Sequence, residues 1–381
     1  LRCEGAQEGC RVGGPGPHLH VQGLQDDASL VAPELLQAQD EILETGRGTR
    51  CLAHGITCGV TKKRVVYLPR RSPVATAWIS RGLATTVESL LIRFLVRLAA
   101  LLPLPLARAL GRLLGRLTWG LGGRAQRVTA RNIALAFPQL PPADRQRLAQ
   151  RSLQATAELV AETGWVWHRP WPRLRRSLRE VRGLDALLAA LDSGRGVLVL
   201  GPHLGNWELL GLHLATLGVD TVTLYEPPQL RGLDGLLRAA RQRTGARLVP
   251  TDRRGLSQLL RCLRGGGLAG VLPDQVPRRQ ASGANSEFMG LPCFTPTLAA
   301  RLLQGSGARA FFAFAERVRG GFRLHYLPAP QALYSPAQAE SLRALNAGVE
   351  HCLRHCPEQY QWEYKRFRTR PPALPDHYAD T

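Results

Sequence analysis

A histidine and a glutamate five positions apart are the residues of this sequence best suited to acid–base chemistry. They are His203 and Glu208, within residues 197–211, which read V-L-V-L-G-P-H-L-G-N-W-E-L-L-G. Inside one helix, side chains five positions apart diverge by about 140°, so the two groups would not meet there. If His203 lies in a loop and Glu208 in the first turn of the next helix, the carboxylate can fold back under the imidazole. We therefore predict a general base whose other ring nitrogen donates to a carboxylate that fixes its tautomer.

The same stretch predicts the elements that position this pair. The run Val197–Leu200 is short, apolar and bounded by glycines, which predicts a buried strand. Apolar residues at helical spacing over residues 207–217, with Asn206 at the N-cap position, predict a helix. His203 then lies in the strand-to-helix turn, where small residues leave room for a ligand. The alternative is a histidine that only hydrogen-bonds within its loop.

The motif resembles one from a known family. G-P-H-L-G-N-W-E is similar to the H-x4-D/E motif of glycerolipid-type acyltransferases, and G-N-W before the glutamate resembles the late acyltransferases of lipid A biosynthesis, the lauroyl and myristoyl transferases. Further stretches resemble this family in chain order: R-N-x4-F-P at 131–138, an arginine-bearing segment at 241–244, Asp274-Gln275, which resembles the family's strand-end acidic pair, and W-x-x-K/R-R-F within 358–370. The resemblance covers about residues 83–378.

The resemblance implies transfer of a fatty acyl group from an acyl carrier protein thioester to a hydroxyl of a lipid A precursor. The enzyme would work at the cytoplasmic face of the inner membrane, with His203 as general base assisted by Glu208. Another membrane lipid, such as a glycolipid or a lysophospholipid, is the alternative acceptor. The oxyanion formed in the attack needs hydrogen-bond donors, for which we consider backbone N–H groups of the Gly205 turn or an arginine.

The same stretches supply the candidate substrate-binding residues. These are Asn206, Arg241, Arg243, Asp274, Gln275, Lys365 and Arg366. An arginine at 241 or 243 could hold a phosphate through a bidentate fork, although a solvated helix face is the alternative. Asp274 and Gln275 could bind sugar hydroxyls or support the base, although a strand-end aspartate also commonly makes turn hydrogen bonds.

Composition limits the classes of partner. The chain has 381 residues, 44% of them hydrophobic, and a formal net charge of +21. Such an excess predicts a partner of opposite sign: nucleic acid, an anionic membrane surface, phosphorylated lipid or an acidic carrier protein. Nucleic-acid binding is disfavoured because the arginines follow leucine-rich faces and no nucleic-acid motif is recognised. A membrane-bound scaffold is disfavoured because His203 and Glu208 are both present.

Motifs that the sequence lacks narrow the chemistry further. It contains no G-x-S-x-G elbow and no G-x-x-x-x-G-K-S/T loop, which disfavours a serine acyl-enzyme and nucleotide hydrolysis. Zinc bound by His203, Glu208 and His213 is disfavoured because the last two are five positions apart in one predicted helix. We predict neither a metal nor a cofactor.

The amino-terminal part divides into two segments before the acyltransferase domain at 126–381. Residues 1–75 show no sustained periodicity, and we predict a disordered leader or an over-extended reading frame. Residues 76–125 read as an amphipathic membrane-anchor region, because arginines recur among leucines at 93, 97, 108, 112 and 116. The longest uncharged run, Leu98–Ala107, is too short for a bilayer span. Two helices that cover the core are the alternative.

These elements together predict the fold class. Strands are expected at Thr221–Tyr225, within Gly266–Asp274, at Ala308–Ala315 and at Gly321–Leu327, with helices between them. Such alternation is typical of an α/β fold with a central, largely parallel sheet and helices on both faces. The amphipathic membrane-associated segment would precede it.

Overall fold

The computed structural model describes residues 56–61, 64–69, 92, 94, 96–228, 233–371, 375–379 and 381. The chain divides into two compact units, Leu1–Leu83 and Ala84–Thr381. In the first unit, the described residues form an antiparallel hairpin of β1 (Ile56–Thr61) and β2 (Arg64–Pro69). The rest of the predicted leader, the anchor residues 76–91 and Arg93 lie outside the described residues, so the predictions made for them stay predictions.

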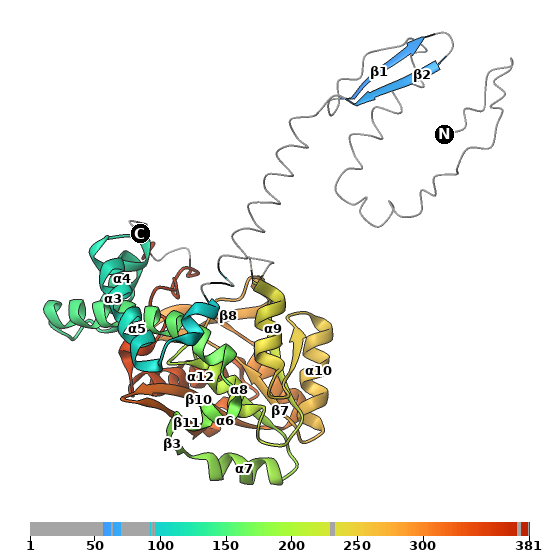
Figure 1. Ribbon diagram of the computed structural model, residues 1–381. Helices are drawn as coiled ribbons and strands as arrows, with labels where there is room; N and C mark the ends of the chain where they lie inside the picture. Colours follow the sequence, from blue (N-terminus) through green and yellow to red (C-terminus); the bar gives the residue numbers. More distant parts are fainter. Residues whose placement is uncertain are drawn as a thin grey trace. The chain divides into compact units, whose positions relative to one another are not determined.

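The second unit is built on a seven-stranded sheet (Figure 1). The strands, in their order across the sheet, are β3 (Leu178–Arg182), β11 (Gly321–Pro328), β10 (Arg309–Val318), β4 (Val197–Leu200), β7 (Leu268–Val271), β5 (Thr221–Tyr225) and β6 (Arg247–Pro250). Among these described strands, β10 and β11 form the one antiparallel pair. The predicted α/β fold with a mostly parallel sheet is confirmed.

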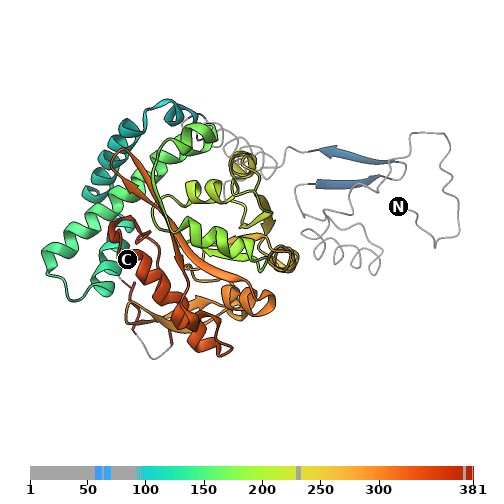
Figure 2. The same cartoon turned by 90° about the horizontal axis from the view of Figure 1, so that it is seen from below.

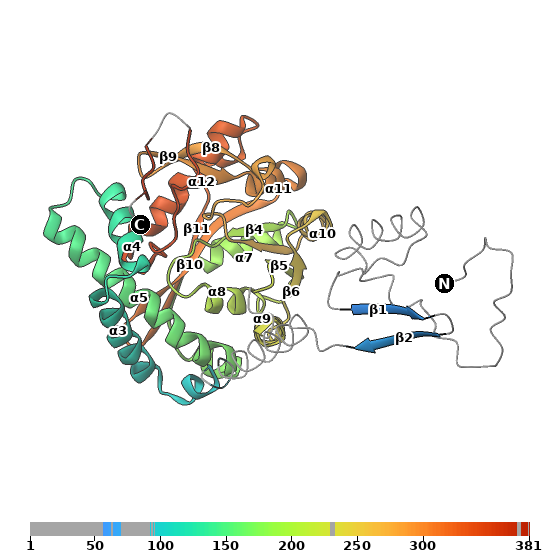
Figure 3. The ribbon, with the colours of Figure 1, turned by 90° about the horizontal axis from the view of Figure 1, so that it is seen from above.

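Helices cover both faces of this sheet. The described helices include α3 (Leu104–Gly120), α4 (Arg124–Ala136), α5 (Pro142–His168), α6 (Trp171–Arg175), α7 (Leu184–Asp192), α8 (Trp207–Leu214), α9 (Asp234–Gln242), α10 (Arg253–Arg264), α11 (Leu298–Ser306) and α12 (Gln338–Leu353). In Figure 3, α11 and α12 lie on one side of the sheet and α8 on the other. A small hairpin of β8 (Gly283–Phe288) and β9 (Leu291–Pro296) lies outside the main sheet.

The side chains of β4 show why both faces are covered. Successive side chains of a strand point to opposite faces. Val197 and Val199 belong to a buried cluster with side chains of α7 and α8. Leu198 and Leu200 belong to a second cluster with side chains of α10, α11 and α12. A strand buried on both faces needs a continuous apolar run, which this stretch provides.

Small residues bring α3 against α5. A Cβ added at Gly111 would lie 2.6 Å from Glu158 Cα, and one added at Gly115 would lie 2.4 Å from Gln154 Cα. Larger residues there would force the helices apart, and Figure 2 shows the two helices side by side. The opposite face of α3 exposes leucines to solvent: Leu106, Leu110, Leu113, Leu114 and Leu117.

One of the recurring arginines of the predicted anchor region is not at the surface. Arg108 is only 8% exposed and pairs with the buried Glu162. Arg112 pairs with Glu158, while Arg97 and Arg116 are exposed. The prediction that Arg108 belongs to the solvent-facing cationic side of this region is therefore wrong, because Arg108 lies on the helix face that packs inward. None of the described helices has the length and hydropathy needed to span a bilayer.

Candidate active site

The turn between β4 and α8 has the predicted form. Asn206 is the N-cap of α8, and its side-chain oxygen accepts a hydrogen bond from the Leu209 N–H at 3.0 Å. Gly205 has a φ of 65°, and a Cβ there would lie 2.0 Å from the Ala315 carbonyl oxygen, so only glycine fits. The Gly205 N–H donates to Gln359 O and the Gln361 N–H to His203 O. The carboxyl-terminal segment, which contains Gln359 and Gln361, therefore holds the turn that carries His203.

The carboxylate that contacts the His203 imidazole is Asp274. Nδ1 of the imidazole lies 2.7 Å from Asp274 Oδ1, and the backbone N–H of His203 donates to Asp274 Oδ2 at 2.9 Å. The His203 side chain is 12% exposed and that of Asp274 is 2% exposed. The predicted pairing of the imidazole with Glu208 is therefore wrong: the orienting carboxylate comes from the residues after β7, the strand next to β4.

Asp274 is held in its ionised form. Burial alone would raise the pKa of this carboxyl group, but the adjacent His203 ring and its two hydrogen bonds outweigh burial and hold the pKa below its ordinary value. The ionised carboxylate accepts the Nδ1 proton, so the lone pair of the neutral ring lies on Nε2. This is the tautomer that a base facing substrate requires.

Glu208 instead binds Arg241. The guanidinium donates from Nε to Glu208 Oε2 at 3.0 Å and from Nη2 to Oε1 at 2.5 Å, a bidentate fork. Trp167 Nε1 also donates to Oε2 at 3.0 Å. Burial opposes ionisation of Glu208, but the guanidinium outweighs it, so the pKa of this carboxyl lies below its ordinary value. Glu208 therefore fixes Arg241 at the first turn of α8, which follows the turn that carries His203.

The amide of Gln275 lies at the free nitrogen of the imidazole. Gln275 Nε2 is 3.2 Å from His203 Nε2 and also donates to Gln361 Oε1 at 3.1 Å. Both neighbours accept, since the imidazole proton lies on Nδ1, so the two amide hydrogens have partners. An attacking hydroxyl must replace this amide at Nε2.

The carboxyl-terminal segment adds two groups that sequence analysis did not select. Gln361 supports the Gln275 amide, and Glu363 accepts a hydrogen bond from Thr156 Oγ1 at 3.1 Å. Burial raises the pKa of the Glu363 carboxyl, against the hydrogen bonds that it accepts. Their position on either side of Trp362, the first residue of the W-x-x-K/R-R-F block, was the available signal.

The other predicted substrate-binding residues have protein partners. Asn206 is fully buried, with its amide nitrogen on Glu162 and its oxygen on Leu209 N–H. Arg366 is 2% exposed and donates to Phe294 O and Thr295 Oγ1. These two side chains stabilise the fold around the site, which argues against direct contact with a substrate.

Arg243 and Lys365 also donate to backbone carbonyls. Arg243 donates to the carbonyls of Val166 and Arg169. Lys365 Nζ donates to Thr381 O at 2.8 Å. Of the four predicted basic residues, the structure brings Arg241 to the catalytic turn, through Glu208.

No cluster of three or more His, Cys, Asp or Glu side chains that could hold a metal ion occurs among the described residues. His213, which the zinc hypothesis would have required, is buried, with its Nδ1 at 2.7 Å from the Tyr326 hydroxyl.

Comparison with known proteins shows which family and relatives this sequence resembles. A model of the family described as bacterial lipid A biosynthesis acyltransferase matches residues 77–369. The lipid A biosynthesis lauroyltransferase of Escherichia coli K12 is 28% identical over 259 residues, 67% of this chain and 83% of the relative. The palmitoleoyltransferase of the same organism is 26% identical over 65% and 80% of the two chains. Its myristoyltransferase is 23% identical over 66% and 78%.

Proposed function

The chain belongs to the bacterial lipid A biosynthesis acyltransferase family, and on that premise we propose that it transfers a fatty acyl group from acyl carrier protein to a hydroxyl of a lipid A precursor. The observation that carries the mechanism is the His203–Asp274 pair, in which Nδ1 donates to the carboxylate and leaves Nε2 as a base. The purified chain, given acyl carrier protein thioesters and a lipid A precursor, should yield a product heavier by one acyl group in mass spectrometry. The proposal would be contradicted if no acylated product formed with any acyl chain length offered.

The base acts in two steps. The acceptor hydroxyl takes the place of the Gln275 amide at Nε2, and its proton moves to Nε2 as its oxygen attacks the thioester carbonyl carbon. Asp274 stabilises the imidazolium that forms, because its two oxygens face Nδ1 and the backbone N–H. When the carbon–sulfur bond breaks, Nε2 returns the proton to the thiolate. No acyl-enzyme forms in this scheme.

The oxyanion is stabilised by Arg241. The N–H groups of Gly205 and Asn206 already donate to Gln359 O and Ala315 O, so they are not free for the substrate. Arg241 uses Nε and Nη2 on Glu208, and a guanidinium carries five N–H groups. The remaining ones are available to negative charge that develops on the carbonyl oxygen. In this scheme Glu208 orients Arg241 rather than the imidazole.

Charge reversal at Arg241 tests this assignment. In Arg241→Glu a carboxylate would face Glu208, and the cation near the reacting carbonyl would be lost. Acyl transfer should fall by roughly 10²–10³-fold, the usual cost of removing one oxyanion donor. Arg319→Glu, a reversal at an exposed arginine, is the control and should leave turnover unchanged. Unchanged acyl transfer by Arg241→Glu together with lost binding to nucleic acid would overturn the enzymatic role of this arginine.

The partners of the enzyme follow from charge and from α3. Acyl carrier protein is acidic, which suits a chain of net charge +21. The exposed leucines of α3 would enter the interface of the inner membrane at its cytoplasmic face, where the acceptor is held, while Arg97 and Arg116 meet anionic headgroups. Nucleic acid is not a partner in this proposal.

The α3 surface can be tested without deleting the helix. The variant Leu110→Glu/Leu113→Glu/Leu117→Glu should lose at least about 100-fold in vesicle affinity, since burying each leucine contributes roughly 1.5–3 kcal/mol. The measurement is flotation with vesicles of phosphatidylethanolamine and phosphatidylglycerol. The control, Arg254→Glu/Ser257→Glu on α10, changes the net charge by the same amount at exposed positions. If the leucine variant floats with vesicles as well as the wild type does, the membrane contact is not made by this face of α3.

A further inference from the structure

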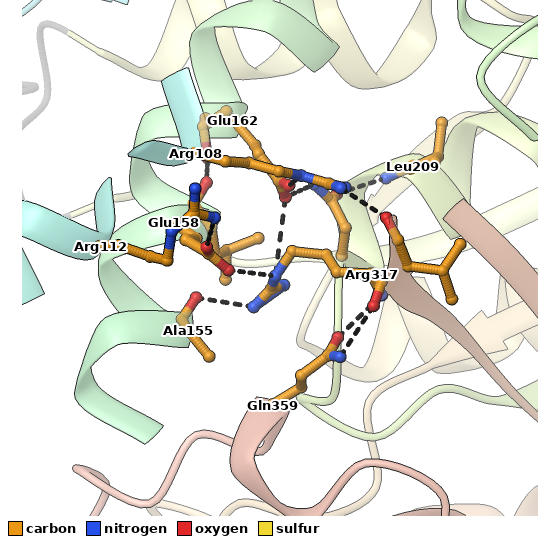
Figure 4. A network of polar contacts seen from close by, with 12 residues as sticks. Arg108, Arg112, Ala155, Glu158, Glu162, Leu209, Arg317 and Gln359 are labelled. Carbon is orange, nitrogen blue, oxygen red and sulfur yellow. Dashed lines mark hydrogen bonds and ion pairs between the residues drawn. The ribbon is translucent and has the colours of Figure 1, made fainter. Parts of the chain in front are cut away.

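A buried carboxylate outside the catalytic pair lies behind the catalytic turn. Glu162, in α5, is fully buried with 0% of its surface exposed. Figure 4 shows it between Arg108 of α3 and Arg317 of β10. Leu209 of α8 lies to the right of this cluster in the view. No step of the proposed reaction uses it.

Each oxygen of Glu162 has a different partner. Oε1 accepts from Arg108 Nε at 2.5 Å, and Oε2 accepts from Asn206 Nδ2 at 2.9 Å. Arg317 Nε lies 3.9 Å from Oε2. Arg108 also donates to the carbonyls of Val318 and Gly321, at the β10–β11 turn. Glu162 therefore joins α3, α5 and the end of the β10–β11 hairpin to the N-cap of α8.

Stability alone is a weak reason for this arrangement. Moving charged groups out of water costs several kcal/mol each, and apolar residues of similar volume often stabilise such sites as well or better. A buried ionic cluster is better explained where a specific geometry depends on it. Here the dependent geometry is the orientation of one amide group.

The amide of Asn206 has two chemically different ends. Because Glu162 accepts from Nδ2, the oxygen Oδ1 must face the Leu209 N–H, where it caps α8. If the amide flipped, Nδ2 would face the Leu209 N–H, which is also a donor, and the cap would be lost. The capped turn fixes both neighbours of Asn206: His203 three residues before it and Glu208 two residues after it.

We propose that Glu162 is a positioning residue for acyl transfer, which fixes the Asn206 amide and through it the relative placement of His203 and of the Glu208–Arg241 pair. The inference rests on the proposed function for its activity measurement, but its geometry is independent of the substrate. Since Arg108 neutralises the same carboxylate, α3 is linked to the catalytic turn through one side chain.

The test is Glu162→Gln with Glu158→Gln as its matched control. Arg108 is always a donor, so the new amide turns its oxygen toward Arg108 and its NH₂ toward Asn206, which then flips and releases Leu209. Turnover should fall by about 10–100-fold with little change in KM, as expected when reacting groups are displaced by about 1 Å. Glu158 lies one helical turn away and contacts Arg112 and Arg317. Its glutamine variant should keep wild-type turnover.

A second substitution separates positioning from loss of folding. In Glu162→Gln/Asn206→Asp, the aspartate accepts from both the new amide and the Leu209 N–H, so turnover should recover at least about tenfold over the single variant. Amide hydrogen exchange of the peptide that contains Leu209 should be faster in Glu162→Gln and return in the double variant. Wild-type turnover and wild-type exchange in Glu162→Gln, or no recovery in the double variant, would overturn the inference. If the wild type itself transfers no acyl group, the proposed function fails, while the exchange pattern still decides the role of Glu162.

Discussion

Replacing His203 by alanine is expected to lower turnover by about 10²–10⁴-fold, the usual contribution of a positioned general base. The imidazole is the base of the turn, because Asp274 accepts its Nδ1 proton and the lone pair on Nε2 is left for the acceptor hydroxyl. Without it, no group at this position removes the proton from the attacking hydroxyl. The measurement is single-turnover transfer from acyl carrier protein at saturating acceptor.

Alanine also leaves the buried Asp274 without its imidazole partner, which costs roughly 1–3 kcal/mol of stability. His203→Asn removes this ambiguity, because its amide N–H can donate to Asp274 while the side chain is no base. Both variants should be inactive, and the asparagine variant should melt closer to the wild type. His351→Ala, at an exposed histidine, should keep full activity. Near-normal turnover in either His203 variant would refute the assignment of the base.

Local sequence patterns predicted the elements that carry the base. The strand at Val197–Leu200 and the strand at Thr221–Tyr225 have the predicted bounds. The first is a short apolar run between Gly196 and Gly201, and the second ends just before Pro227 and Pro228. The N-cap at Asn206 was also correct. These features depend on residues near one another in the chain, where backbone preference and side-chain chemistry act together.

The partner of the base depends on strand order, which local patterns do not contain. β4 pairs with β7 rather than with β5, the next strand along the chain. The residues after two adjacent parallel strands meet at the same edge of the sheet, and this brings Asp274 to His203 across 71 positions. Glu208 was the nearer carboxylate in sequence, but its first-turn position directs it to Arg241.

Two other features that the sequence analysis missed also have physical causes. The strand Leu178–Arg182 reads L-R-E-V-R and gives no apolar run, since it lies at the edge of the sheet with exposed charged side chains. Arg108 looked like its solvent-facing neighbours on α3, and its burial depends on Glu162, which is 54 positions away. A charge that is neutralised at long range cannot be distinguished in sequence from one that faces water.

Asp274→Asn should lower turnover by about 10²–10⁴-fold, because it changes the tautomer of the base rather than removing it. Two donors of His203 face the carboxylate: the backbone N–H at 2.9 Å and Nδ1–H at 2.7 Å. An amide has one acceptor oxygen. Since the backbone N–H cannot change, the oxygen turns to it and the NH₂ faces Nδ1. The ring proton then moves to Nε2. Nε2 therefore presents an N–H donor to the acceptor hydroxyl in place of the lone pair that would remove its proton.

Stability measured against pH provides a check that does not depend on activity. The folded-state pKa of Asp274 lies below its unfolded value of about 3.9, so the unfolded chain binds the proton more readily. The pairing therefore contributes stability that is fully present above about pH 4 and is lost as pH falls through the folded-state pKa. Thermal unfolding of Asp274→Asn should show a smaller loss of stability on acidification than the wild type.

Glu208→Gln is the comparison that separates the two carboxylates. Its amide oxygen still accepts from Arg241, so the fork loses one bond and a charge while the imidazole keeps its partner. Turnover should fall only about tenfold, the effect of roughly 1.4 kcal/mol of transition-state stabilisation. Asp274→Asn should be the more damaging of the two, with an altered pH profile of kcat/KM. The reverse order, with Asp274→Asn close to wild type, would return the orienting role to Glu208 and show that the pairing at Nδ1 does not govern catalysis.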